Sequence, residues 1–200
     1  IGPRVMLSPL SFTVTATAGA ARTGQLTTPH GTTPTPAFMP VGTHGTVKGM
    51  TPHDLRTVGA TIVLANALHL ELRPGAAFFE EFGGLHRFMA WDGPILTDSG
   101  GYQVFSLRHR TKVSEDGVKL CSPLDGQWQM LTPERMVRVQ EQLGVDLAMA
   151  FDECIEWPAT RERVAESTAR TTRWLHRAIA AREAPERTAL LGIVQGGCYA

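Results

Sequence analysis

An excess of either charge is absent from this 200-residue chain, in which 19 basic residues balance 19 acidic ones. A balanced total gives no electrostatic sign of nucleic-acid binding and leaves only local pairs such as Arg108 and Arg110 as candidate contacts. No apolar run approaches the roughly 20 residues that cross a membrane, and the N-terminus lacks the basic-then-apolar pattern of a signal peptide. We therefore expect a soluble, cytoplasmic protein with no membrane association.

Cysteine is scarce. Cys121, Cys154 and Cys198 lie far apart, and no C-x-x-C pair is present. This spacing argues against a disulfide scaffold and against a zinc site made within this chain. The chain is 42% hydrophobic, which is enough to bury a sizeable core, and one domain is the expectation for a chain of this length.

Four continuous apolar runs each end in polar residues that suit a binding site. Runs without alternation predict strands that are buried on both faces, as in a parallel sheet. The runs span residues 61–65, 94–97, 147–151 and 190–194, and the residues that follow them are Asn66, Asp98, Asp152 and Gln195.

Helical signals lie between these runs. Thr51-Pro52 and Thr132-Pro133 each place a capping residue before a first-turn proline, and the second helix is predicted to end at Gly144. A longer helix is predicted from about Thr160 to about Glu183. Its expected apolar face carries Val164, Thr168, Thr171, Leu175 and Ala178. The alternation predicts a βα architecture, whose ligand sites form at the carboxyl ends of the strands.

The segment that follows the second run has two interpretations. Asp98-Ser99-Gly100-Gly101-Tyr102 delivers a carboxylate, a flexible backbone and a flat ring to a cleft. The same residues also make a good Asx-turn or helix N-cap. Beyond them, Asp-Gly pairs at 116–117 and 125–126 predict a small antiparallel excursion, which is either a lid over a substrate or a decorative hairpin.

Six short motifs cover most of the chain. They are TPAFMPVGT from Thr35, LRPG from Leu72, GLH from Gly84, TDSGGYQV from Thr97, FDEC from Phe151 and GIVQGG from Gly192. In this order and spacing they resemble the tRNA-guanine transglycosylase family, also called queuine tRNA-ribosyltransferase. The resemblance extends from about Phe12 onward, and the FDEC form is similar to the bacterial enzymes.

The resemblance implies a (β/α)8 TIM barrel with a structural Zn²⁺ subdomain near its C-terminal end. It implies a pentosyltransferase that exchanges guanine at wobble position 34 of tRNAs with a GUN anticodon (Asp, Asn, His and Tyr). The incoming base is the queuosine precursor preQ1, 7-aminomethyl-7-deazaguanine, and the reaction passes through a covalent enzyme–ribose intermediate. The family is usually homodimeric.

Site residues are carried over position by position. Asp98 resembles the proton acceptor, Ser99, Gly100 and Gly101 the adjacent loop wall, and Tyr102 the ring that stacks on the base. Asp152 resembles the carboxylate that reads the N–H edge of the purine, Gln195 and Gly196 the segment that completes this reading, and Asn66 a polar neighbour. Cys154 resembles a pocket residue that is not a nucleophile.

Two departures from the family stand out. Ala67-Leu68 replaces the usual Thr-Tyr, which should change packing below the pocket. The nucleophilic aspartate and the Cys-x-Cys-x-x-Cys…His zinc ligands of the family lie beyond residue 200. With Ile1 and Ala200 at its ends, the chain is interpreted as the N-terminal half of one barrel, residues 1–200, inactive alone.

Alternatives stay open at this point. A non-catalytic, tRNA-binding partner subunit would keep such a pocket without its chemistry, and a barrel glycosidase would also use two carboxylates. His69 and His86 are more typical of structural histidines, and Glu153 either faces away from the site or pairs with an arginine. The tryptophans Trp91, Trp128, Trp157 and Trp174 are expected to pack rather than to stack on a base.

Overall fold

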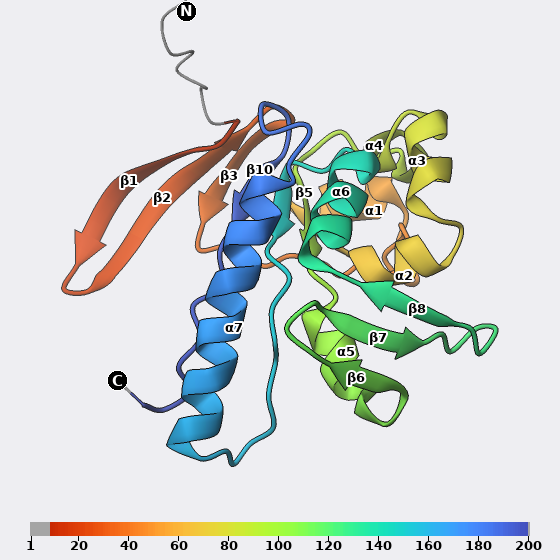
Figure 1. The fold of residues 1–200 in the computed structure, drawn as a ribbon. Coiled ribbons are helices and arrows are strands. Elements are labelled where there is room, and N and C mark those ends of the chain that lie inside the picture. The colour runs from red at the N-terminus through yellow and green to blue at the C-terminus, as the bar shows by residue number, and fades with distance from the viewer. Residues whose placement is uncertain (1–8, 200) are drawn as a thin grey trace, which may run out of the picture.

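The computed structural model describes residues 9–199; Ile1 and Ala200, on which the interpretation of the chain ends depends, lie outside this range. The helices are α1 (Pro52–Thr57), α2 (Ala67–Leu72), α3 (Ala76–Phe82), α4 (Leu85–Met89), α5 (Gly101–Ser106), η1 (Arg108–Arg110), α6 (Pro133–Leu143) and α7 (Arg161–Ala180). They surround a central parallel sheet (Figure 1).

The central sheet has four parallel strands in the order β10-β9-β5-β4, which confirms the predicted parallel α/β architecture. Its strands are β4 (Val63–Asn66), β5 (Ile95–Asp98), β9 (Leu147–Met149) and β10 (Ala189–Leu191). Asn66 lies opposite Asp98 in the register of β4 and β5. The strands β9 and β10 end earlier than predicted, so Asp152 and Gln195 lie on the loops that leave the sheet.

The predicted helix caps are confirmed. Thr51 forms a capping box with Asp54 at the start of α1, and α6 ends at Gly144 in the left-handed conformation, with φ 69°. The hydroxyl of Thr160 caps α7. On α7 the buried face differs in part from the prediction, because Ser167 and Trp174 are buried on it while Thr168 and Leu175 are half-buried.

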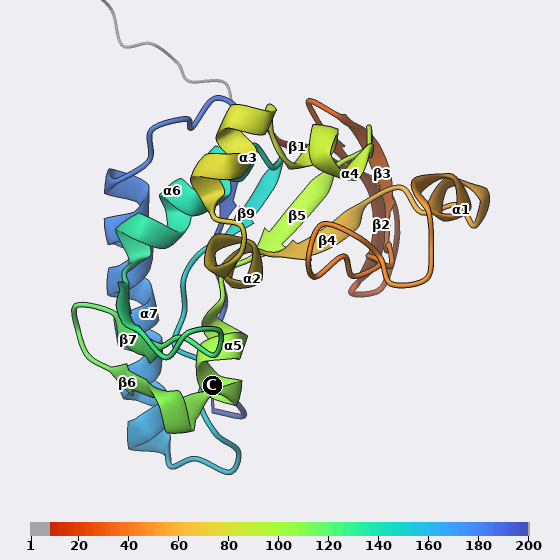
Figure 2. The same cartoon turned by 90° about the vertical axis from the view of Figure 1, so that its right-hand side faces the viewer.

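Two clusters of buried side chains hold the sheet between its neighbours. The larger one joins helices α2, α3, α4 and α6 to the sheet and includes Phe79, Met136 and Phe151. The smaller one includes Ile62 and Leu96, and half-buried side chains of the N-terminal segment pack against it. Figure 2 shows α6 and α7 on one side of the parallel strands and β2 and β3 on the other.

An N-terminal antiparallel sheet was not predicted from the sequence. It consists of β1 (Ser11–Ala18), β2 (Ala21–Thr28) and β3 (Gly31–Thr35). The threonines of this segment favour a strand because they are β-branched, and their signal was outweighed by the turn residues between them. A second antiparallel sheet follows η1, in the region of the predicted excursion. Its strands are β6 (Thr111–Val113), β7 (Val118–Cys121) and β8 (Trp128–Leu131).

The tryptophan prediction is half wrong. Trp91 and Trp174 are buried, as expected for packing residues, but Trp128 is 50% exposed and Trp157 is 72% exposed. Trp128 lies on a sheet whose other face is buried, so its ring is left at the surface between Lys112 and Lys119.

No helix within residues 9–199 is both long enough and apolar enough to cross a bilayer.

A buried carboxylate at the amino end of β9 joins four segments. The two oxygens of Asp146 accept from His30 Nδ1 at 2.8 Å and His86 Nε2 at 3.0 Å, and the amide of Ile95 donates at 2.9 Å. Burial alone would raise the pKa of Asp146, but these hydrogen bonds outweigh burial and hold that pKa far below its ordinary value. His86 is therefore a structural residue of this cluster, as the sequence favoured.

We expect Asp146→Asn to lower the free energy of unfolding at neutral pH by about 2 kcal/mol, because hydrogen bonds to a buried charge are lost. A depressed carboxyl pKa gives stability that is complete above the unfolded value near 3.9 and is lost as the pH falls below it. The difference in the free energy of unfolding between wild type and variant, measured by urea unfolding, should therefore shrink at acidic pH. Asp92→Asn is the control, because its ion pair with Arg56 is exposed and screened by solvent, so its loss should change the free energy of unfolding little.

Candidate active site

Asp98 ends β5, and three N–H donors surround its carboxylate. Asn66 Nδ2 donates to Oδ2 at 2.5 Å, Gln103 Nε2 donates to the same oxygen at 2.9 Å, and the amide of Ala67 donates to Oδ1 at 3.0 Å. The Asn66 contact follows from the parallel register of β4 and β5. These donors hold the carboxylate in one orientation, as a group that accepts a proton from a ligand requires.

Gln103 was not predicted as a site residue. It lies on the first turns of α5, where a side chain five positions after Asp98 can reach back to the strand end. Its Oε1 is buried and has no hydrogen-bond partner among the described residues. A buried acceptor without a partner is costly, so Oε1 is available for a donor on a bound molecule. The signal in the sequence was the amide that directly follows Tyr102.

Asp152 lies beyond β9 and is buried, with 9% of its surface exposed. Ser99 Oγ donates to its Oδ1 at 3.0 Å, and Gln195 Nε2 donates to its Oδ2 at 2.9 Å. Burial raises the pKa of Asp152, the hydrogen bonds from Ser99 and Gln195 oppose this rise, and the charge of Asp98 adds to it. Repulsion between the two carboxylates thus contributes to the raised pKa of Asp152, but desolvation is the larger cause.

The two glycines after Ser99 allow the loops of Asp98 and Asp152 to touch. Gly100 has φ 86°, in the left-handed region, and begins α5. A Cβ atom on Gly101 would lie 2.0 Å from Asp152 Oδ1. The turn interpretation of this segment also holds, since Ser99 Oγ accepts from the Gly101 amide at 3.1 Å. Site and turn are therefore the same structure.

We expect Gly101→Ala to displace the Asp152 carboxylate and to weaken binding of any ligand it holds by about tenfold, since the new methyl group would also lie 2.8 Å from the backbone oxygen of Asp152, which cannot turn away as a side chain can. Equilibrium titration of the whole protein with guanine, the ligand that the family resemblance implies, measures the effect. Gly192→Ala is the control, because its Cβ would meet only the end of the Leu175 side chain at 3.2 Å. Equal affinities in both variants would contradict the expectation.

The remaining predicted residues lie within four positions of Asp98, Asp152 or Gln195 along the chain. Tyr102 is 67% exposed on α5, which leaves its ring free to stack. Cys154 is half-buried, and burial together with Asp152 raises the pKa of its thiol, so the thiol stays protonated rather than nucleophilic. Gly196 follows Gln195 with φ 124°, a conformation that side chains rarely adopt.

The departure at Ala67-Leu68 also lies at this site. The Ala67 amide is one of the three donors to Asp98. Leu68 is buried and would touch a side chain placed on Gly100, with its Cβ 3.1 Å from the built atom. An aliphatic side chain therefore fills the space beside Gly100. His69 packs edge-on against His44 at 5.2 Å between ring centroids, and burial, followed by His44, lowers the pKa of His69.

Residues 9–199 do not supply the zinc site whose ligands the family resemblance places beyond residue 200. Cys121, Cys154 and Cys198 are all free, and none belongs to a cluster of metal-binding side chains within residues 9–199. The group of possible ligands found in this range is His30, His86 and Asp146, whose atoms lie within 4.8 Å of one another. This set contains no thiolate, and its two histidines already form hydrogen bonds with Asp146 at the amino end of β9.

Comparison with known proteins bears on this geometry. The family model described as queuine tRNA-ribosyltransferase matches residues 17–200. A queuine tRNA-ribosyltransferase of Thermus thermophilus is 53% identical over 191 residues, which is 96% of this chain and 49% of the relative. One of Desulforudis audaxviator is 55% identical over 179 residues, 90% of this chain and 48% of the relative. The chain thus spans about half the length of the curated relatives it matches.

Proposed function

The chain belongs to the queuine tRNA-ribosyltransferase family, and from this premise we propose that it supplies the base-binding and proton-accepting part of a tRNA-guanine transglycosylase. The observation that carries the proposal is the pairing of two carboxylates, Asp98 at the end of β5 and Asp152 on the loop that follows the neighbouring strand β9. Asp98 is held by amide donors, and Asp152 is buried between Ser99 and Gln195. This arrangement suits one group that accepts a proton and another that reads a base.

Asp98 is proposed to manage the proton of the exchanging base. In the first half of the reaction the aspartate that the family resemblance places beyond residue 200 attacks C1′ of the ribose. The C1′–N9 bond breaks, and guanine leaves with its electrons and takes up a proton from water at N9. In the second half the incoming base loses its N9 proton to Asp98 and attacks C1′, which releases the nucleophilic carboxylate, and Asp98 then returns the proton to water. General-base assistance of this kind contributes about 10²–10⁴-fold to a rate.

Asp152 is proposed to read the edge of the purine. Guanine and preQ1 present two N–H donors on this edge, and an ionised carboxylate accepts both, whereas the edge of adenine presents its donors differently. Gln195 and Ser99 hold the carboxylate for this purpose. Tyr102 would stack on the base, a contact that is worth about 1–3 kcal/mol in the binding of single-stranded nucleic acids.

The finer points of the resemblance are part of the same proposal. They comprise a (β/α)8 barrel to which residues 1–200 contribute the first half, and the β6–β8 sheet as an insertion into it. They also comprise the wobble position of GUN tRNAs as target, preQ1 as incoming base, a homodimer, a cytoplasmic location and a structural Zn²⁺. No step of the reaction described above depends on zinc.

The test is incorporation of labelled guanine into a tRNA with a GUN anticodon by the whole protein, with Asp98→Ala as control. We expect exchange in the wild type and none in the control. If neither protein exchanges guanine while both bind the tRNA, the chain instead belongs to a non-catalytic partner subunit. Retention of Asp98, Asp152 and Gln195 in contact with their partners argues against that alternative.

A further inference from the structure

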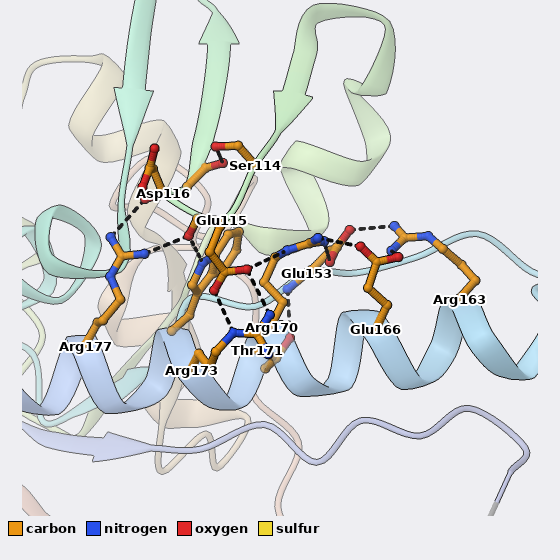
Figure 3. Close-up of polar contacts among 12 residues, drawn as sticks. Ser114, Glu115, Asp116, Glu153, Arg163, Glu166, Arg170, Thr171, Arg173 and Arg177 are labelled. Atoms are coloured by element: carbon orange, nitrogen blue, oxygen red, sulfur yellow. Dashed lines mark hydrogen bonds and ion pairs between the residues drawn. The ribbon is translucent and has the colours of Figure 1, made fainter.

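A second buried carboxylate lies directly beside Asp152. The Glu153 side chain is 4% exposed and faces α7 (Figure 3). Arg163 Nη2 donates to its Oε1 at 2.5 Å, and Arg170 Nη1 donates to its Oε2. The amide of Glu153 donates to Thr171 Oγ1 at 3.1 Å. One helix therefore binds both the side chain and the backbone of this residue.

The other neighbour of Asp152 is held by the same helix. The Phe151 ring stacks on Trp174 of α7 at 5.1 Å between centroids and 6° between planes. Side chains of an extended segment alternate in direction, so Phe151 and Glu153 face α7 while Asp152 faces Ser99 and Gln195. Residues 150–156 form no regular secondary structure. Their backbone is held instead by the contacts that α7 makes with Phe151 and Glu153, on either side of Asp152.

The helix also binds the turn between β6 and β7. Arg173 donates to both oxygens of Glu115 at 2.7 and 2.9 Å, and these hydrogen bonds lower the pKa of Glu115 to about 2. Arg177 donates to the carbonyl oxygens of Glu115 and Asp116 at 2.8 and 2.9 Å. Arg170 lies between the two attachment points, since its Nε is 3.5 Å from Glu115. These contacts fix the position of α7, and the helix in turn holds the segment that contains Asp152.

We propose that Glu153 is a positioning residue for base recognition, whose ion pairs with Arg163 and Arg170 fix the backbone so that the Asp152 carboxylate faces the base. The inference rests on the proposed function for its ligand. Glu153 has no role as a reacting group, because its carboxylate faces α7 and both its oxygens are taken by arginines. A buried carboxylate that loses its charge leaves two guanidinium groups partly unpaired, and the segment then moves.

The test compares Glu153→Gln with Glu166→Gln in the whole protein. Glu166 also pairs with Arg170, at 2.6 Å, but it is 57% exposed and lies on α7 itself. We expect Glu153→Gln to raise KM for guanine about tenfold with kcat and KM for tRNA nearly unchanged, since misplacement of a binding group by about 1 Å has effects of this order. Glu166→Gln should match the wild type. Glu153→Asp, which keeps the charge, should recover part of the loss.

Hydrogen–deuterium exchange of the peptide that covers residues 150–156 decides the matter without an activity assay. We expect faster exchange there in Glu153→Gln and not in Glu166→Gln. The positioning role would be overturned if hydrogen–deuterium exchange in Glu153→Gln were unchanged. It would also be overturned if this variant had a lower melting temperature but an unchanged KM for guanine. A wild type that exchanges no guanine but shows the same contrast in deuterium uptake would refute the proposed function and leave the positioning of Asp152 intact.

Discussion

Asp98→Asn is expected to lower kcat for guanine exchange by about 10³-fold, within the range that general-base groups contribute. The amide has nearly the shape of the carboxylate but cannot take the proton from N9. Its NH₂ group would also face the donors Asn66 and Gln103, which now point at a charged oxygen. Single-turnover incorporation of labelled guanine into tRNA measures the loss.

Binding of tRNA should survive in Asp98→Asn to within about threefold, because phosphate contacts supply most of the affinity for a nucleic acid. Asp98→Ala should lose as much activity as Asp98→Asn and so separates the missing carboxylate from a misplaced amide. A melting temperature close to that of the wild type is the check on folding. Full activity in either variant would remove Asp98 from the role proposed for it.

Asp152→Asn is expected to raise KM for guanine by about 100-fold, because one acceptor on the purine edge is replaced by a donor and buried donors are left facing each other. The loss should fall on guanine and not on tRNA. Steady-state kinetics with each substrate varied in turn distinguishes the two. If only the affinity for tRNA fell, the reading of the purine edge would be assigned to the wrong residue.

The pH dependence of the same step follows from the raised pKa of Asp152, which burial causes. Below this pKa the carboxyl group is protonated and one of its oxygens becomes a donor, so guanine should bind more weakly as the pH falls. The window should lie above the value near 3.9 of an ordinary aspartate. In Asp152→Asn this pH dependence of the dissociation constant for guanine should disappear, since the group that titrates is gone.

Local patterns in the sequence were enough for most of the architecture. Thr51, Thr132 and Thr160 mark helix starts because a cap involves only the next three residues, and the confirmed caps lie where the pattern placed them. The parallel strands follow from runs of apolar residues for the same reason. The β1–β3 sheet was missed, because the turn residues between its strands outweighed the alternating pattern of residues 11–18.

For the candidate site, too, some features could be predicted from the sequence and others could not. The resemblance of the motifs named the residues, and the parallel order of the strands explains why Asn66 meets Asp98. Which side chain holds which carboxylate was decided only by the tertiary structure. Ser99 and Gln195 reach Asp152 from positions more than 40 residues away along the chain.

The sequence by itself determined the family and the parallel α/β architecture and named the two carboxylates of the proposed site, because each of these depends on contiguous or periodic residues. The tertiary structure alone decided that Gln103 binds Asp98 and that Arg163 and Arg170 bind Glu153. It also decided that Asp146 closes the amino end of the sheet with His30 and His86. The sequence does not distinguish among the many arginines of the chain, and only packing brings two of them to the buried carboxylate of Glu153.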